Sequence, residues 1–249
     1  MDKLKIGDIT VDGELKKLLI DGADVFNISL KEEQVDKFFR YKDVLKEWNE
    51  KINLTAIEED REIIIKHFID SLSILPLIKD ENVKLIDVGT GAGFPGIPVK
   101  IARESIEVTL LDSLDKRVKF LNEVIKVNAL SGIKALHGRA EEKGVLPEFR
   151  EKFDISTARA VANLPVLIEY CLPFVKVGGY FIAMKGSNID EIDSSKKALD
   201  ILGGKIEEVK EFNLPFTDSK RNIIVIKKFR QTPTKYPRKA GKPSKEPLI

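Results

Sequence analysis

The sequence predicts an α/β protein with a mostly parallel sheet, helices on both of its faces, and a helical segment in front. From about residue 80, strand-like runs alternate with helical segments over roughly 100 residues, which is typical of a parallel sheet with right-handed crossovers. Before residue 80 the pattern is helical, without a strand signal. Near the end, two strand-like runs follow each other with no helix between them, which indicates an antiparallel hairpin.

We therefore divide the 249 residues into a helical N-terminal extension (1–79), an α/β domain (80–230) and a basic C-terminal tail (231–249). In the extension, residues 29–32 resemble a capping box that opens one amphipathic helix. A second amphipathic helix is expected over residues 63–77.

The strand-like runs are short and rich in β-branched and aliphatic side chains. We expect parallel strands over residues 83–88, 107–112, 133–137, 153–157 and 180–184, and a hairpin over 206–212 and 222–229. Helices are expected near 96–103, 115–128, 164–175 and 188–202. In such sheets the ligand lies at the carboxyl ends of the strands, so functional residues should follow each strand.

Composition excludes several classes of protein. The chain has 42 Lys or Arg, 40 Asp or Glu and 43% hydrophobic residues, as in an ordinary soluble domain. Its single cysteine cannot form an internal disulfide, and no apolar stretch approaches the ~20 residues that span a bilayer. Residues 1–6 alternate charged and apolar positions, unlike a secretory signal. We expect a cytoplasmic protein with no metal site and no obligate protein partner.

A glycine-rich loop follows the first predicted strand. Residues 87–96 read DVGTGAGFPG and lead directly into a helical pattern. Glycines let the backbone approach a ligand closely and present N–H groups from the start of the helix. A tight turn alone needs only one or two glycines, so Gly89, Gly91, Gly93 and Gly96 together favour a nucleotide-like ligand.

Two acidic residues bear on which nucleotide-like ligand the loop binds. The spacing Gly91-x-Gly93-x-x-Gly96, with Asp112 about 20 residues downstream, matches the dinucleotide pattern and leaves NAD open. Asp87, just before the first glycine, offers a carboxylate that suits an amino-acid ammonium group. No second domain with hydride-transfer residues follows the sheet. These features favour S-adenosylmethionine, with an NAD-dependent oxidoreductase as the alternative.

The third predicted strand ends at a further candidate site. Ala140 and Glu141 could give a backbone N–H and a side-chain acceptor to an adenine edge. The simpler explanation for the acidic pair is a helix N-terminus, where acids are common.

Residues 158–165, after the fourth strand, occupy the place that would face the methyl acceptor. They contain no Asn/Asp-Pro-Pro-Tyr/Phe sequence, which argues against methylation of an exocyclic amine. Cys171 lies in an apolar helix, where a thiol is usually inert, which argues against covalent catalysis. A ring nitrogen such as guanine N7 fits, because it carries a free lone pair and needs no base. Arg159 and Lys185 are expected to face ligand, Arg159 as a cofactor or phosphate contact, with a surface ion pair as the simpler alternative.

Several motifs together resemble the glucose-inhibited division protein B family, the ribosomal RNA small subunit methyltransferase G family. They lie at residues 53–57, 67–72, 87–98, 138–141, 158–162 and 236–245. The resemblance implies a class I, Rossmann-like, S-adenosylmethionine-dependent methyltransferase. It would methylate N7 of a guanosine in the 530 loop of 16S ribosomal RNA, free or in the small subunit, by in-line displacement without a covalent intermediate.

The resemblance also implies site residues. The family's cofactor-binding positions match Gly89, Phe94, Ala140, Glu141 and Arg159, and its ribose-facing turn matches Asp112, Ser113 and Leu114. Positions expected to face RNA match Arg139, Arg159, Lys185, Arg238, Lys239, Lys242 and Lys245. The motif at His67 could be a structural clasp between the extension and the sheet. A non-catalytic RNA-binding or ribosome assembly factor on the same scaffold remains the alternative of a different class.

Overall fold

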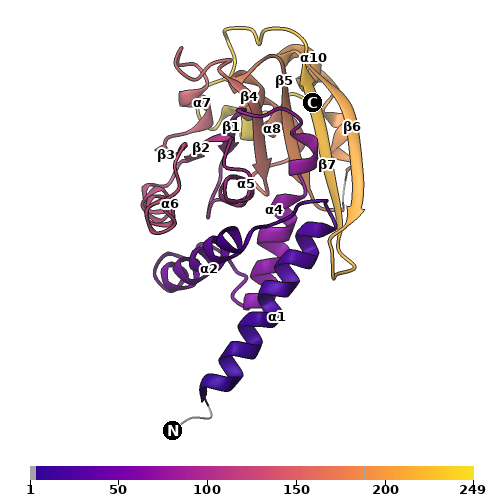
Figure 1. Ribbon diagram of the computed structural model, residues 1–249. Helices are drawn as coiled ribbons and strands as arrows, with labels where there is room; N and C mark the ends of the chain where they lie inside the picture. Colours follow the sequence, from indigo (N-terminus) through magenta and orange to yellow (C-terminus); the bar gives the residue numbers. More distant parts are fainter. Residues whose placement is uncertain (1–3, 188) are drawn as a thin grey trace.

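The computed structural model describes residues 4–187 and 189–249 and contains one seven-stranded sheet in the order β3-β2-β1-β4-β5-β7-β6 (Figure 1). Strands β1 to β5 are parallel, and β7 pairs antiparallel with both β5 and β6, which confirms the predicted topology. The strands are β1 Lys84–Val88, β2 Glu107–Asp112, β3 Ile133–His137, β4 Phe153–Arg159, β5 Val175–Lys185, β6 Gly204–Asn213 and β7 Lys220–Lys228.

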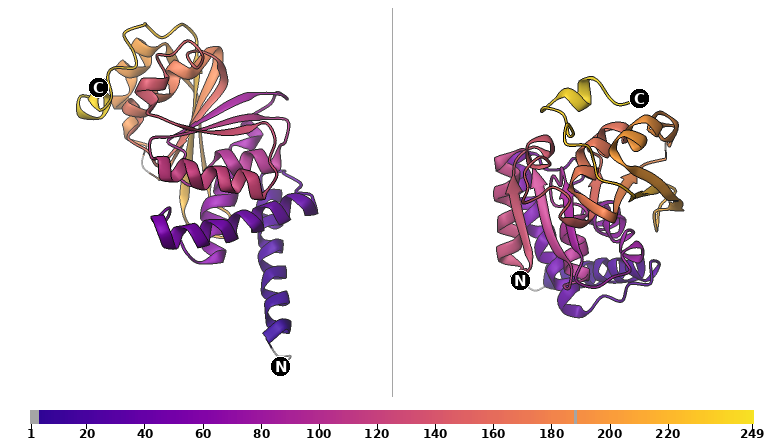
Figure 2. Two further views of the ribbon diagram at one scale, coloured as in Figure 1. Left: turned by 90° about the vertical axis from the view of Figure 1, so that its left-hand side faces the viewer. Right: turned by 90° about the horizontal axis from the view of Figure 1, so that it is seen from above.

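Helices cover both faces of the sheet and build a separate N-terminal region. One face carries α2 Glu32–Ile52, α5 Gly96–Ala102 and α6 Asp115–Val127, and the other carries α8 Leu164–Cys171 and α10 Lys196–Leu202. The long helix α1 Leu4–Asp24 projects from the end opposite the C-terminal tail (Figures 1 and 2). The shorter helices are α3 Asp60–Ile63, η1 Ile64–Ile69, α4 Asp70–Leu72, η2 Leu75–Leu77, α7 Ala140–Lys143, η3 Leu172–Phe174, α9 Glu191–Ser194 and α11 Lys242–Lys245.

Alternation along each strand divides the core between the two faces. In β1, Leu85 packs with the N-terminal helices, whereas its neighbour Ile86 packs with α8 and α10. The N-terminal helices therefore share one hydrophobic core with the sheet. None of the helices in the described chain is long and apolar enough to cross a membrane.

The predicted capping box at residues 29–32 is wrong. Helix α2 begins at Glu32, and the side chain of Gln34 caps it by accepting a hydrogen bond from the Lys31 N–H at 2.8 Å. The amide nitrogen of Gln34 also donates to the carbonyls of Ile101 and Ala102. Because the Gln34 side chain caps α2 and also binds α5, the helix begins at Glu32 and Ser29 is not its N-cap residue.

The predicted helix over 63–77 is interrupted by the π-helical turn η1 and ends in the 3₁₀ turn η2, which contains a proline. Isolated π turns often lie at functional positions, and this one carries His67. The helix expected over 188–202 is split into α9 and α10, because Ser195 Oγ donates to the Glu191 carbonyl and competes with the backbone. Asn188 lies outside the described residues.

The C-terminal tail packs on the domain and is not a solvated extension. Tyr236 and Leu248 are buried in the core on the α8 side. The guanidinium of Arg150 donates to the carbonyls of Thr232, Pro233 and Tyr236 and holds the start of the tail. Figure 2 shows this yellow segment running over the end of the molecule that lies away from α1.

We expect Gly93→Ala to destabilise the fold more than Gly91→Ala, by about 3 against about 1 kcal/mol. Both glycines have positive φ, but a Cβ on Gly93 would lie 2.5 Å from Ile97 Cδ1 and 2.8 Å from Tyr41 Oη, whereas one on Gly91 meets nothing within 4 Å. Urea unfolding measures both losses. Equal losses of unfolding free energy in the two variants would show that the close contacts of a Cβ at position 93 do not destabilise the fold.

Candidate active site

Two carboxylates hold the glycine loop at the carboxyl ends of β1 and β2. Asp87 Oδ2 accepts hydrogen bonds from Thr90 Oγ1 at 2.6 Å and from the Gly96 N–H at 2.9 Å. Asp112 accepts from the Gly91 N–H through Oδ2 and from the Leu114 N–H through Oδ1, each at 2.9 Å. Both acids predicted from sequence thus lie at the loop, where they shape its backbone.

Asp87 is fully buried, and its Oδ1 has no hydrogen-bond partner within the described chain. Burial raises the pKa of this carboxyl to about 6, against the opposing effect of its hydrogen bonds. A carboxyl with a pKa that is raised on folding stabilises the fold below its ordinary pKa and loses that contribution as the pH rises through about 6.

We therefore expect the stability of the natural chain to fall, relative to that of Asp87→Asn, by about 2 to 3 kcal/mol between pH 4 and pH 7. The asparagine has no proton to lose, so the difference between the two unfolding free energies isolates this carboxyl. Urea unfolding at each pH measures it. Parallel pH profiles for the two proteins would contradict a raised pKa at Asp87.

The first cavity of the site has a volume of about 190 Å³ and lies at the ends of β1, β2 and β3. Four of the predicted cofactor residues line it, namely Gly89, Ser113, Ala140 and Glu141, and so does Arg139. Asp87, Gly91, Gly93, Phe94, Asp112 and Leu114 are not part of this lining. The wall is completed by three residues that were not predicted from the sequence as cofactor contacts, Tyr170, Gly241 and Ser244. The signal for the last two is the motif at 236–245, for which the sequence predicts contact with RNA.

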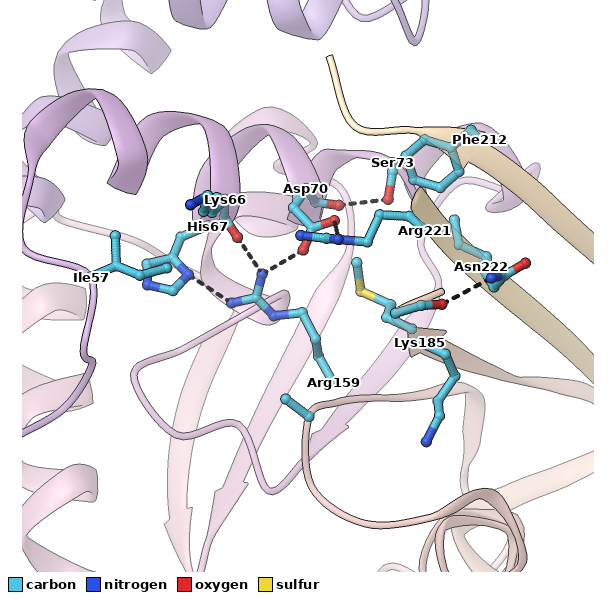
Figure 3. A pocket seen from close by; sticks show the side chains of 14 residues that line it. Ile57, Lys66, His67, Asp70, Ser73, Arg159, Lys185, Phe212, Arg221 and Asn222 are labelled. Atoms are coloured by element: carbon cyan, nitrogen blue, oxygen red, sulfur yellow. Dashed lines mark hydrogen bonds and ion pairs between the residues drawn. The ribbon is translucent and has the colours of Figure 1, made fainter. Parts of the chain in front are cut away.

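The second cavity, of about 330 Å³, lies at the ends of β4 and β5 beside the N-terminal helices. Figure 3 shows side chains from η1, α4, β4, β5 and β7 converging on it. Its polar lining includes His67, Asp70, Arg159, Lys185, Arg221 and Asn222.

Arg159 points across this second cavity toward the N-terminal helices (Figure 3). Its guanidinium donates to the Lys66 carbonyl at 3.0 Å and to Asp70 Oδ2 at 2.9 Å, and it lies 5.0 Å from the centre of the Phe94 ring. Asp70 Oδ1 also accepts from Arg221 at 3.1 Å, so one buried carboxylate serves two arginines. Neither Asp70 nor Arg221 was predicted from the sequence as a member of the site.

His67 is held as a neutral imidazole between two partners. Its Nδ1 accepts from Arg159 at 3.1 Å, which leaves the Nε2 proton to be donated to Thr55 Oγ1 at 2.8 Å. Burial and the neighbouring Arg159 charge lower the pKa of His67 to about 3. The ring also stacks on Phe94, with 4.4 Å between centroids. These contacts confirm the predicted clasp between the extension and the sheet.

Lys185 holds the loop that follows β4. Its Nζ donates to the Ala162 carbonyl at 3.1 Å and pairs with Glu191 at 3.0 Å. That loop separates the two cavities, because Ala160 lines the second and the next residue, Val161, lines the first. Consecutive Cα atoms are only about 3.8 Å apart, so the cavities are neighbours.

The residues expected to face RNA divide into two groups. Arg139, Lys239, Lys242 and Lys245 are exposed near the first cavity. Arg238 instead turns inward, where its guanidinium makes a bidentate ion pair with the buried Glu169, at 2.6 Å for the shortest contact. Arg238 is therefore not proposed to contact RNA. Within the described residues, no group of three or more His, Cys, Asp or Glu could hold a metal ion.

Comparison with known proteins gives the same family as the sequence motifs. A family model described as rRNA small subunit methyltransferase G (GidB) matches residues 34–224. The chain is 72% identical over 235 residues to ribosomal RNA small subunit methyltransferase G of Acetivibrio thermocellus, covering 94% of this chain and 97% of that relative. It is 55% identical over 238 residues to the protein of the same name in Alkaliphilus oremlandii, covering 94% and 99%.

Among solved structures, a ribosomal protein L11 methylase from Lactobacillus delbrueckii subsp. bulgaricus matches with a TM-score of 0.50 and 17% identity. The match covers 66% of this chain and 79% of that one and shows a likeness of fold alone. The predicted family and fold class are confirmed, and a methyltransferase family favours S-adenosylmethionine over the NAD alternative. The chain belongs to the rRNA small subunit methyltransferase G family.

Proposed function

We propose that this chain transfers the methyl group of S-adenosylmethionine to N7 of a guanosine in the 530 loop of 16S ribosomal RNA. The observation that carries the proposal is the pair of neighbouring cavities at the carboxyl ends of the sheet, separated only by the loop after β4. Direct methyl transfer requires two ligands that meet in line, and two adjacent cavities offer that arrangement.

The first cavity suits the cofactor. Gly89, Ser113 and Ala140 line it, the open space above Gly91 admits a ligand close to the backbone, and Asp112 holds the loop beneath. The unpartnered Oδ1 of Asp87 fits an ammonium group that reaches the base of the loop. When bound, S-adenosylmethionine supplies an electrophilic methyl group.

The second cavity suits the acceptor nucleoside. Lys66, Arg159, Lys185 and Arg221 line it together with one carboxylate, Asp70, and this excess of cationic side chains favours a nucleotide and its phosphates. Asn222 adds a side-chain oxygen that has no hydrogen-bond partner in the described chain and matches the N–H donors of guanine. These residues would orient the base and exclude water from it.

The chemistry needs neither a nucleophile nor a base from the protein. Cys171 lies buried in α8, where burial raises the pKa of its thiol well above the ordinary value. Asp70 is committed to two arginines and His67 is neutral with both ring nitrogens occupied, so neither is free to take a proton. Guanine N7 requires no deprotonation, which makes it the acceptor that these groups can serve.

The substrate is proposed to be ribosomal RNA within the small subunit or an assembly intermediate. Exposed cations at Arg139, Lys239, Lys242 and Lys245 would contact phosphates and carry affinity rather than sequence information. Selection of one guanosine would then come from the folded shape of the RNA.

The test is incubation of the protein with radiolabelled S-adenosylmethionine and small subunits from a strain that lacks this gene. We expect label in 16S RNA and strand scission at a single guanosine after borohydride and aniline treatment, which detects N7-methylguanosine. Subunits from the parent strain, already methylated, are the control and should accept no label. Cofactor binding without transfer to any form of 16S RNA would favour the non-catalytic alternative.

A further inference from the structure

The C-terminal tail turns back over the first cavity and is fastened there by two residues that line it. The N–H of Gly241 donates to Glu141 Oε1 at 2.9 Å, and the hydroxyls of Tyr170 and Ser244 lie 2.9 Å apart. Gly241 and Ser244 are themselves part of the cavity wall. The tail and the strand-end loops therefore enclose one space.

The position of residues 241–244 rests on buried anchors just before them. Arg238 pairs with Glu169, which is 1% exposed, and Tyr236 is buried in the core beside α8. The backbone N–H of Arg238 donates to the same Glu169 carboxylate at 2.8 Å. Gly241 lies only three residues after Arg238, which leaves the chain little freedom, so the contact of Gly241 with Glu141 belongs to the fold.

Glu141 is placed to hold the tail. Its side chain is almost fully buried, and its Oε1 accepts a hydrogen bond from the Gly241 N–H. A ligand could bind this oxygen only by displacing the Gly241 N–H. Charge-assisted hydrogen bonds from a carboxylate to a backbone N–H are among the stronger ones in proteins.

We propose that residues 240–249 form a wall of the adenosine end of the cofactor site and that Glu141 is a positioning residue, which acts on cofactor affinity by holding Gly241. This inference rests on the proposed function, in which the first cavity binds S-adenosylmethionine. The same segment carries Lys242 and Lys245, so an occupied cofactor site would also fix the place of two exposed cations.

A double-mutant cycle separates this role from direct contact with adenine. Calorimetry with S-adenosylhomocysteine is performed on the natural chain, Glu141→Ala, a chain that ends at Lys239, and the combination. The shortened chain keeps the anchors Tyr236 and Arg238. We expect each single change to raise Kd about 10-fold or more and the combination to raise it no further than shortening alone. The neighbouring Glu142→Ala, outside the cavity lining, should change Kd less than about 2-fold.

If the double variant raised Kd by the product of the two single increases, the positioning role would be overturned, because Glu141 would then act on Kd independently of the tail. An unchanged Kd in the shortened chain would overturn the wall. If the shortened chain unfolds, Tyr170→Phe removes only the hydroxyl that holds Ser244 and should raise Kd measurably; an unchanged Kd would again overturn the wall. Failure of the natural chain to bind would instead overturn the proposed function.

Limited proteolysis gives an independent reading on the natural chain. Trypsin should cut after Lys239 and Lys245 several-fold more slowly when S-adenosylhomocysteine is present, because a ligand against the wall holds the tail in place. Cleavage after Lys17, on the distant helix α1, provides the reference rate. Equal rates with and without the ligand would overturn the wall.

Discussion

Replacement of Asp70 by alanine is expected to lower the free energy of unfolding by about 3 to 5 kcal/mol. The carboxylate is 4% exposed and pairs with Arg159 at 2.9 Å and Arg221 at 3.1 Å. Its removal leaves two guanidinium groups without a counter-charge in a partly buried setting. Urea unfolding of the natural chain and of the variant measures the loss.

The matched control is Asp21→Ala, which breaks the exposed pair with Lys17 on α1. Exposed pairs contribute about 0 to 1 kcal/mol, so this variant should unfold almost like the natural chain. Asp70→Asn keeps the volume of the side chain but removes its negative charge. It should therefore show most of the loss of unfolding free energy seen in Asp70→Ala, because the two arginines again lack a counter-charge. A loss at Asp70→Ala as small as that at Asp21→Ala would show that the clasp does not stabilise the fold.

Asp112→Ala is expected to weaken binding of S-adenosylmethionine by at least about 30-fold, which corresponds to about 2 kcal/mol. The side chain is buried and accepts the N–H groups of Gly91 and Leu114, so its loss frees both the glycine loop and the turn after β2. It would also remove the acid expected at the ribose. Isothermal calorimetry measures the affinity.

Asp112→Asn keeps one acceptor oxygen and should lie between the natural chain and the alanine variant. Asp115→Ala changes a nearby exposed acid that pairs with Lys119 and should leave the affinity unchanged. An unchanged affinity of Asp112→Ala for S-adenosylmethionine would contradict the assignment of this acid to the cofactor site.

The sheet could be predicted because each strand carries its own signal. Strands β2 and β3 lie at the predicted residues, because each is a short run with apolar residues that is bounded by turn residues. The glycine loop and Asp112 followed from the same logic, because they are read along one stretch of chain. Boundaries such as the start of α2 were harder, as Gln34 caps the helix through a contact that also depends on α5.

The clasp around Arg159 could not be derived in the same way. It joins side chains at positions 67, 70, 159 and 221, and nothing local in the sequence shows that a carboxylate in α4 meets arginines on β4 and β7. The tail is similar, because its motif was predicted to face RNA through the family resemblance, whereas Arg238 pairs with a buried acid in α8. Long-range ion pairs become visible only when the fold brings the segments together.

We propose that the cofactor and the acceptor base occupy the two neighbouring cavities on either side of the loop after β4. A crystal structure of the protein with S-adenosylhomocysteine and guanosine monophosphate tests it most directly. We expect adenosine beside Ala140 and Gly241 and the base beside Arg159 and Asn222. Either ligand in the cavity of about 510 Å³ at the opposite end of β5, beside Lys176, would contradict the claim.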